Sequence, residues 1–172
     1  MKTLKLMMLF MAFTAVAAMP LLTSCGKDDD EKAPADPSGT YTGEISIVLP
    51  MLGTTTTPNA VAVVEKTGNA YSLTLTNLGI AVPQVATIAI GDVTFPDITY
   101  ANGALGGGTP QSKDVTLPEA FLGMPGVTDS EITVTVSLAT GTVKGNNLKF
   151  TLNVATGISL MPSVLVTFDG NK

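Results

Sequence analysis

Apolar and polar side chains alternate along most of the chain after residue 38. Apolar residues occupy nearly every second position, with mostly threonine, serine, asparagine or charged residues between them, in four long stretches: residues 41–49, 71–76, 132–138 and 148–154. A period of two is typical of β-strands that have one buried and one solvent-facing side. The same pattern predicts shorter strands at residues 61–66, 85–90, 92–100, 114–117 and 163–168.

The segments between these stretches carry the residues that turns require. Lys66-Thr67-Gly68-Asn69 and Gly145-Asn146-Asn147 predict tight hairpins, because glycine and asparagine tolerate a positive φ. Residues 101–110 contain four glycines and predict a flexible loop, and residues 118–126 predict a second loop. Apart from a short helical turn around residues 119–122, no helix is expected after residue 38.

The fold class that follows is all-β and mostly antiparallel. An up-and-down barrel of about eight strands is the economical closure, because hairpins with one apolar side bury that side by curling and leave no exposed edge. The interior of such a barrel is filled by side chains or holds one small ligand. A two-sheet β-sandwich gives almost the same pattern and stays open as the alternative.

The first 24 residues have the three parts of a secretory signal peptide. Two lysines form a charged start, residues 6–18 form an apolar stretch, and small residues precede a cleavage point. A membrane-spanning helix is the alternative. A span needs about 20 apolar residues, however, and Thr14 and Pro20 interrupt a shorter run. We therefore expect residues 1–24 to be removed.

Leu22-Thr23-Ser24-Cys25 resembles the lipobox that the bacterial lipoprotein signal peptidase recognises. The resemblance implies that cleavage frees the amine of Cys25, that the thiol carries a diacylglycerol, and that the amine takes a third acyl chain such as palmitate. Three chains suit a permanent anchor, because one chain contributes only about 0.8 kcal/mol per buried methylene and binds a membrane marginally. Lipidation of Cys25 is the one site that the sequence predicts.

Residues 25–38 are expected to form the lipidated cysteine and an acidic, flexible tether. Four acidic residues follow one another at 28–31, and prolines follow as far as Pro37. The acidic run resembles the export signal of many Gram-negative surface lipoproteins, which implies a position on the outer face of the outer membrane. A calcium-binding loop is the alternative. Such a loop needs alternating ligands, a turn glycine and a distal glutamate, and the run at residues 28–31 does not have this order.

Charge and composition exclude several classes of function. Without the two lysines of the signal peptide, seven lysines and fourteen acidic residues remain, a net charge of −7, and the chain has neither arginine nor histidine. Nucleic-acid binding needs a basic face and is not expected. The only cysteine is assigned to the lipid, so we expect no disulfide. Zinc and copper sites need histidine or cysteine ligands and are not expected in the domain.

The sequence predicts no enzyme, no metal and no cofactor. Ser-His-Asp and Cys-His arrangements need a histidine, and the S-x-x-K match at residues 24–27 loses its serine on cleavage. Residues 106–109 have the glycines of a phosphate loop without its lysine and helix. Two acidic pairs on strands remain, Glu44 with Glu65 and Asp92 with Asp97. Charges on the solvent face of a strand are their ordinary explanation.

Residues 39–172 are expected to form one domain, and their pattern resembles a known family. Thr40-Tyr41-Thr42-Gly43 opens a strand, Tyr71-Ser72-Leu73-Thr74-Leu75 follows a Gly-Asn turn, and residues 145–152 lead to residues 164–168. Together these stretches resemble the calycin-like, or lipocalin-like, β-barrel lipoproteins of the Gram-negative surface. The resemblance implies a barrel and a hydrophobic ligand.

Two functions remain open. In the first, a surface lipoprotein binds a small hydrophobic molecule inside the barrel, under the loop that carries Phe121 and Met124. The alternative for the interior is that side chains fill it completely, so that it forms a hydrophobic core and holds no ligand. In the second, the barrel is a structural or interaction protein that displays loops to a surface protein or a glycan complex. The expected partners are the membrane, through the anchor, and one small hydrophobic ligand. The expected interior residues are Ile45, Ile47, Leu73, Leu75, Val134, Val136, Phe150 and Leu152.

Overall fold

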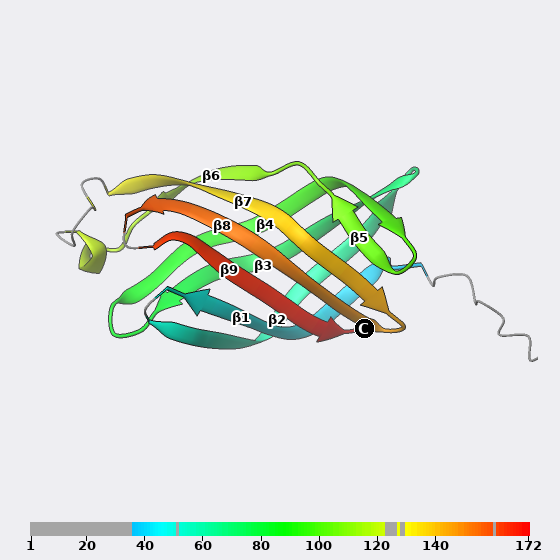
Figure 1. The fold of residues 1–172 in the computed structure, drawn as a ribbon, viewed down its shortest axis with the longest axis horizontal. Helices are drawn as coiled ribbons and strands as arrows, with labels where there is room; N and C mark the ends of the chain where they lie inside the picture. Colours follow the sequence, from blue (N-terminus) through cyan, green and yellow to red (C-terminus); the bar gives the residue numbers. More distant parts are fainter. Residues whose placement is uncertain (1–35, 51, 123–126, 128–129, 160) are drawn as a thin grey trace, which may run out of the picture. The chain divides into compact units, whose positions relative to one another are not determined.

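The computed structural model describes residues 36–50, 52–122, 127, 130–159 and 161–172. The predicted signal peptide, Cys25 and the acidic run lie outside these residues. Within them the chain forms nine strands and one short 3-10 helix (Figure 1). Their bounds are β1 Gly39–Leu49, β2 Gly53–Thr67, β3 Ala70–Val82, β4 Ala86–Ala101, β5 Ala104–Gly107, β6 Gln111–Thr116, η1 Glu119–Phe121, β7 Glu131–Lys144, β8 Asn147–Ile158 and β9 Met161–Asn171.

The strands form one antiparallel sheet that closes on itself as a barrel (Figure 1). Each strand pairs with the next from β1 to β5 and from β6 to β9, and β1 also pairs with β9. The pairing of β5 with β7 completes the circle of eight strands, and β6 is an additional strand beside β7. The predicted all-β barrel is therefore confirmed, and the sandwich alternative is set aside.

The two ends of the barrel differ, and we name them by the place where the chain enters. The proximal end holds Asp36, the turns at Gly68, Gly103 and Gly145, and the last residue, Lys172. The distal end holds the connections β1–β2, β3–β4, β6–β7 and β8–β9. In Figure 1, η1 lies at the distal end and the β7–β8 turn at the proximal end.

Two strand predictions are wrong in detail. The two strands predicted within residues 85–100, separated at Gly91, are one strand, β4, because Gly91 continues the strand with a φ of 79° at a shift in register. Residues 101–110, predicted as a flexible loop, contain the strand β5. This strand fits because Gly141 on β7 leaves room for Leu105, whose Cβ lies 2.9 Å from the place of a Cβ on Gly141.

The inward side chains form a continuous core. All eight interior residues that the sequence predicts are buried. Phe150 and Phe168 stack with their ring centroids 5.0 Å apart, and the Phe168 ring also covers Gly170. Burial of apolar surface is the dominant favourable term in folding, so this core is the main source of stability in the domain.

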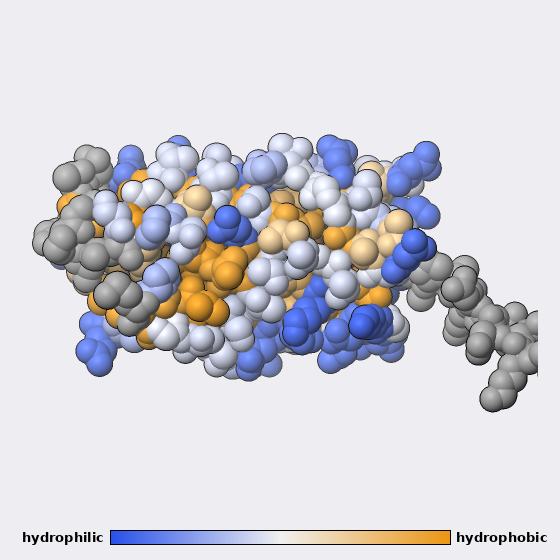
Figure 2. Space-filling view, viewed as in Figure 1, coloured by the Kyte–Doolittle hydropathy of each residue, from blue (hydrophilic) through white to orange (hydrophobic). Residues whose placement is uncertain are grey.

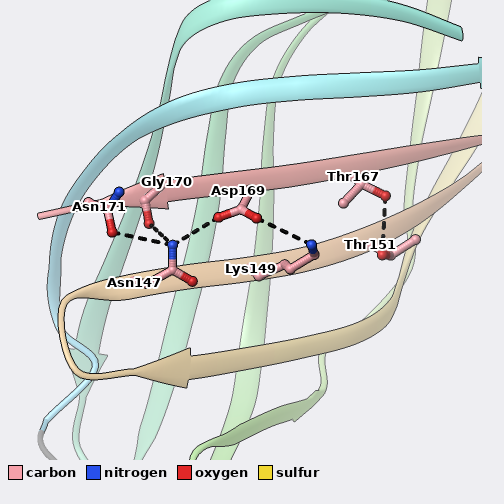
Figure 3. A network of polar contacts seen from close by, with 7 residues as sticks. All are labelled: Asn147, Lys149, Thr151, Thr167, Asp169, Gly170 and Asn171. Carbon is pink, nitrogen blue, oxygen red and sulfur yellow. Dashed lines mark hydrogen bonds and ion pairs between the residues drawn. The ribbon is translucent and has the colours of Figure 1, made fainter.

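A polar network lies on the outer side of β8 and β9 near the proximal end (Figure 3). The side-chain amide of Asn147 donates to Asp169 Oδ1 at 2.8 Å, to Gly170 O at 3.1 Å and to Asn171 Oδ1 at 3.3 Å. Lys149 forms an ion pair with Asp169 at 3.2 Å. The hydrogen bond from Asn147 and, after it, the contact with Lys149 hold the pKa of Asp169 below its usual range. The network fixes the end of β9 to the start of β8.

Residues Lys32–Lys172 form one compact unit, and the other unit, Met1–Glu31, lies outside the described residues. The strands of the described unit close on themselves, and the core residues among the described part of the chain all belong to this unit. A unit with its own hydrophobic core is of the kind that folds independently. We therefore expect a chain of residues 32–172 to fold without the segment before it.

Candidate functional site

Tyrosine side chains cover the core at the proximal end of the barrel. Tyr71 and Tyr100 meet edge to face, with ring centroids 6.0 Å apart, and both pack against the core. Tyr41 is fully buried, and its hydroxyl donates to Pro37 O at 2.6 Å. The ammonium of Lys66 lies 5.8 Å from the centre of the Tyr71 ring. These are all three tyrosines of the protein, and together they restrict access to the interior from this end.

Lys172 holds the segment before β1, residues 36–38, across the proximal end of the barrel. Lys172 Nζ donates to Ser38 O at 2.6 Å and to Asp36 O at 3.2 Å, and it lies 5.2 Å from the centre of the Tyr41 ring. The backbone N–H of Ser38 donates to the Asp36 carboxylate at 2.9 Å. This hydrogen bond is the main reason why the pKa of Asp36 lies below its usual range. The last residues of the expected tether therefore contact the barrel.

The buried phenol of Tyr41 makes stability depend on pH. Burial, followed by negative charge at Tyr100 and Asp36, raises the pKa of Tyr41 to about 12, from a value of 10.0 without these surroundings. Between these values the folded protein keeps the phenolic proton and the unfolded chain loses it, so stability falls as the pH rises from 10 toward 12. We expect Tyr41→Phe to reduce this fall. Thermal unfolding of both proteins from pH 8 to pH 11 measures it, and equal slopes of Tm against pH would contradict the assignment.

The wall of the barrel is incomplete in its distal half. β2 pairs with β3 only from Ala62 to Thr67, and its earlier residues pair only with β1. The distal half of β3 pairs only with β4, and β6 pairs only with β7. Among the described residues, the β3–β4 hairpin beyond Thr76 thus has no ladder partner on either side. We call the unpaired line between β2 and β3 in this half the β2–β3 seam.

Side chains connect the root of this hairpin to its surroundings. Thr76 Oγ1 donates to Val61 O on β2 at 3.0 Å. The N–H of Asn77 donates to the Asp92 carboxylate at 2.8 Å, and Asn77 has a φ of 51° at a shift in the β3–β4 register. On the other side of the hairpin, the ammonium of Lys113 on β6 donates to Asp92 O. Side-chain hydrogen bonds thus replace the missing ladder at this point.

The inner side of β2 is accessible to solvent at the seam. Thr55 pairs with Ile47, and Thr57 pairs with Ile45. Both isoleucines point into the barrel, and directly paired residues share a face. Thr57 is nevertheless exposed and Thr55 is partly so, whereas Ala62 is fully buried where the wall is complete. The seam therefore presents hydroxyl groups beside an aliphatic interior.

The alternation pattern does not find these threonines. Residues 54–57 are four consecutive threonines, so inward and outward positions carry the same side chain, and the predicted strand begins only at residue 61. The structure begins the strand at Gly53. The high β-propensity of threonine is the signal that could have extended the prediction.

A loop with a 3-10 turn contacts the core at the distal end. Phe121 of η1 is fully buried, and its N–H donates to Pro118 O at 2.9 Å. The N–H of Leu117 donates to Ser130 O at 2.7 Å, which joins the two ends of the β6–β7 connection. The predicted short turn is confirmed, and Phe121 packs against the core as a cap would. Met124, the other expected capping residue, lies outside the described residues.

Several large apolar side chains are exposed in the distal half of the described barrel. Val48 and Leu165 are directly paired across β1 and β9 and both point outward. Leu52, after β1, and Leu122, after η1, are exposed as well. Figure 2 shows apolar surface on the side of the barrel that carries β9. A partner-binding surface stays a prediction, because no contact within the described residues shows what covers these side chains.

The acidic candidates from the sequence are surface residues. Glu44, Glu65, Asp92 and Asp97 are all exposed, and Asp92 belongs to the root of the hairpin. In the described part of the chain, no group of three or more His, Cys, Asp or Glu side chains is placed to hold a metal ion. No helix within the described ranges has the length and apolar character needed to cross a membrane. The absence of enzyme activity stays a prediction.

Comparison with known families adds one finding. A family model described as the calycin-like beta-barrel domain matches residues 38–171. The match begins at Ser38, which Lys172 holds against the barrel, and it ends with the last residue of β9. No curated protein and no solved structure gives a significant match to the chain.

Proposed function

Because the chain belongs to the calycin-like β-barrel family, we propose that it binds a small hydrophobic molecule in the distal half of its barrel. In this proposal the protein is a lipoprotein, held through Cys25 on the outer face of the outer membrane. The observation that carries the binding proposal is the accessible inner side of β2 at the β2–β3 seam. The seam gives a small molecule a lateral route to the aliphatic interior.

The arrangement of the wall supports this location. Tyrosines and the entering chain lie over the core at the proximal end, and Phe121 packs on it at the distal end. Small-molecule sites are mostly apolar, with a few placed polar groups, which fits hydroxyls beside isoleucines. Segments with few backbone hydrogen bonds to their neighbours open most readily. The β3–β4 hairpin is such a segment, so it is the part of the wall that yields to a ligand.

The proposed address follows from the residues before the barrel. The lipobox-like run ending at Cys25 supplies the anchor, and the acidic run at residues 28–31 supplies the export signal of surface lipoproteins. Apolar molecules leave water readily for an apolar surface. A barrel on the cell surface is therefore suited to collect such molecules from the medium.

Extraction of the purified barrel tests the binding proposal. Residues 32–172, produced without the anchor and purified without detergent, are extracted with organic solvent, and the extract is weighed by mass spectrometry. We expect one small apolar species in about equimolar amount. After extraction and refolding, we expect the apolar fluorescent probe N-phenyl-1-naphthylamine to bind with a rise in emission. The urea-unfolded chain is the control for unspecific adsorption. An empty extract from a barrel that also leaves the probe in water would contradict the proposal.

A further inference from the structure

The hydroxyl of Thr55 has no partner within the barrel. Thr55 Oγ1 is buried, and it makes no hydrogen bond among the described residues. A buried polar group without a partner is unfavourable, and valine would avoid this cost at nearly the same size. Thr156 shows the ordinary arrangement, since its hydroxyl donates to Met161 O and accepts from the N–H of Ile158. The hydroxyl of Thr55 therefore has an unused capacity to bond with a ligand.

The position of Thr55 puts this hydroxyl where a ligand would reach it if the β3–β4 hairpin moved outward. Thr55 lies on the inner side of β2 beside Ile47, and the next inner residue, Thr57, is exposed. On the β3 side of the seam, Ile80 and Val82 are buried inward residues. Outward movement of the β3–β4 hairpin would therefore expose this hydroxyl together with aliphatic side chains of β3.

The strand segments around Thr55 carry no charged side chain of their own. The strand segments that form this part of the wall are residues 45–49, 53–60 and 77–82, all described, and none of their side chains is ionisable as an acid or a base. Charged groups lie at the base of the β3–β4 hairpin, where the Asp92 carboxylate accepts from the N–H of Asn77 and the ammonium of Lys113 donates to Asp92 O. A buried carboxylate or ammonium without a partner is strongly disfavoured. The site therefore selects against ionised ligands.

We propose that the β2–β3 seam binds a neutral amphiphile, a long-chain alcohol or an ester of one. Its polar oxygen forms a hydrogen bond with Thr55 Oγ1, and its hydrocarbon chain lies against Ile80 and Val82. A threonine hydroxyl donates and accepts, so both an alcohol and an ester carbonyl satisfy it. This inference rests on the proposed function and adds to it the class of ligand and its orientation, with the oxygen at β2 and the chain toward β3.

Competition against N-phenyl-1-naphthylamine tests the inference on residues 32–172. The competitors are decan-1-ol and, at pH 8, decanoate. We expect Thr55→Val to raise the concentration of decan-1-ol needed for half-displacement about tenfold, the value of one hydrogen bond of about 1.4 kcal/mol. Thr55→Ser keeps the hydroxyl and is expected to retain near wild-type displacement. Thr56→Val, on the exposed outer side of the same strand, is the matched control and is expected to leave it unchanged.

The outcomes separate this inference from the proposed function. A barrel that binds neither the probe nor an extractable molecule overturns the proposed function and the inference with it. A barrel that binds the probe, but releases it to decan-1-ol equally in the wild type and in Thr55→Val, keeps the proposed function and overturns the role of Thr55. Displacement by decanoate at the same concentration as by decan-1-ol overturns the neutral class of ligand. Circular dichroism of each variant shows that the compared proteins are folded.

Discussion

Gly43→Ala is expected to lower the free energy of unfolding by about 3 kcal/mol or more, the upper range for overpacking a closely packed site. A Cβ on Gly43 would lie 2.1 Å from Asp169 O and 2.3 Å from Gly170 Cα. Both atoms belong to the backbone of β9, so rotation of a side chain cannot relieve the contact. The first and last strands of the barrel must separate instead. Urea titration of residues 32–172, followed by circular dichroism, measures the change.

β9 has little freedom to move away from such a Cβ. Its last residues are held to β8 by the Asn147 network (Figure 3). The Phe168 ring fills the space beside Gly170, where a Cβ would lie 2.6 Å from the ring carbon Cζ. Gly106→Ala is the matched control, because the nearest atom to its added Cβ is 3.6 Å away, an ordinary contact. If the two variants lost equal stability, the close approach of β1 and β9 would be contradicted.

The inward face of the barrel was predictable because a strand with one buried and one solvent-facing side alternates apolar and polar side chains with a period of two. Phe150 and Leu152 illustrate this, since polar residues flank each of them along β8. A shift of the strand register by one residue would expose both side chains to solvent, so the alternation itself defines the buried side. Closure into a barrel followed from the need to remove exposed edges. The same local rules predicted the hairpin turns at Gly68 and Gly145.

Two segments were missed, and one of them carried a local signal. The Asn102-Gly103 turn between β4 and β5, with φ values of 51° and 78°, is of the kind that joins hairpins, whereas the pairing of β5 with β7 also needs Gly141, far along the chain, to make room for Leu105. The four threonines at 54–57 extend β2, but identical side chains do not indicate which face is inward. The β2–β3 ladder ends at Ala62 and Leu75, and the alternation pattern of either strand does not indicate this end.

The two candidate sites differ in the same way. Cys25 is predicted from sequence because its chemistry depends on a short contiguous motif. Thr55 gains significance only from the structure, since the position of its hydroxyl and the lack of a described partner depend on three strands. A hydroxyl with no partner is invisible in a sequence that contains many threonines.

Cys25→Ala is expected to abolish lipid attachment and to leave the apolar signal peptide, residues 1–24, uncleaved. The thiol and the amine of Cys25 are the proposed attachment points for three acyl chains. Each chain contributes about 0.8 kcal/mol per buried methylene, and two or more chains are needed for stable anchoring. Without the thiol, neither lipid attachment nor cleavage by the lipoprotein peptidase takes place. Immunoblots of a Gram-negative host measure the change as a larger, uncleaved form of the variant. Labelling with a radioactive fatty acid reports the lipid directly.

Ser24→Ala is the matched control, because it keeps a small residue before the cleavage point and should leave labelling and membrane association unchanged. Protease added to intact cells then separates the two faces of the outer membrane, since only a protein on the outer face is digested without lysis. Full labelling of the wild type together with resistance to the protease would keep the anchor but contradict the surface position. Incorporation of fatty acid into Cys25→Ala would contradict the anchor itself, because an acyl chain would then have to be attached at a residue other than Cys25, the only thiol in the chain.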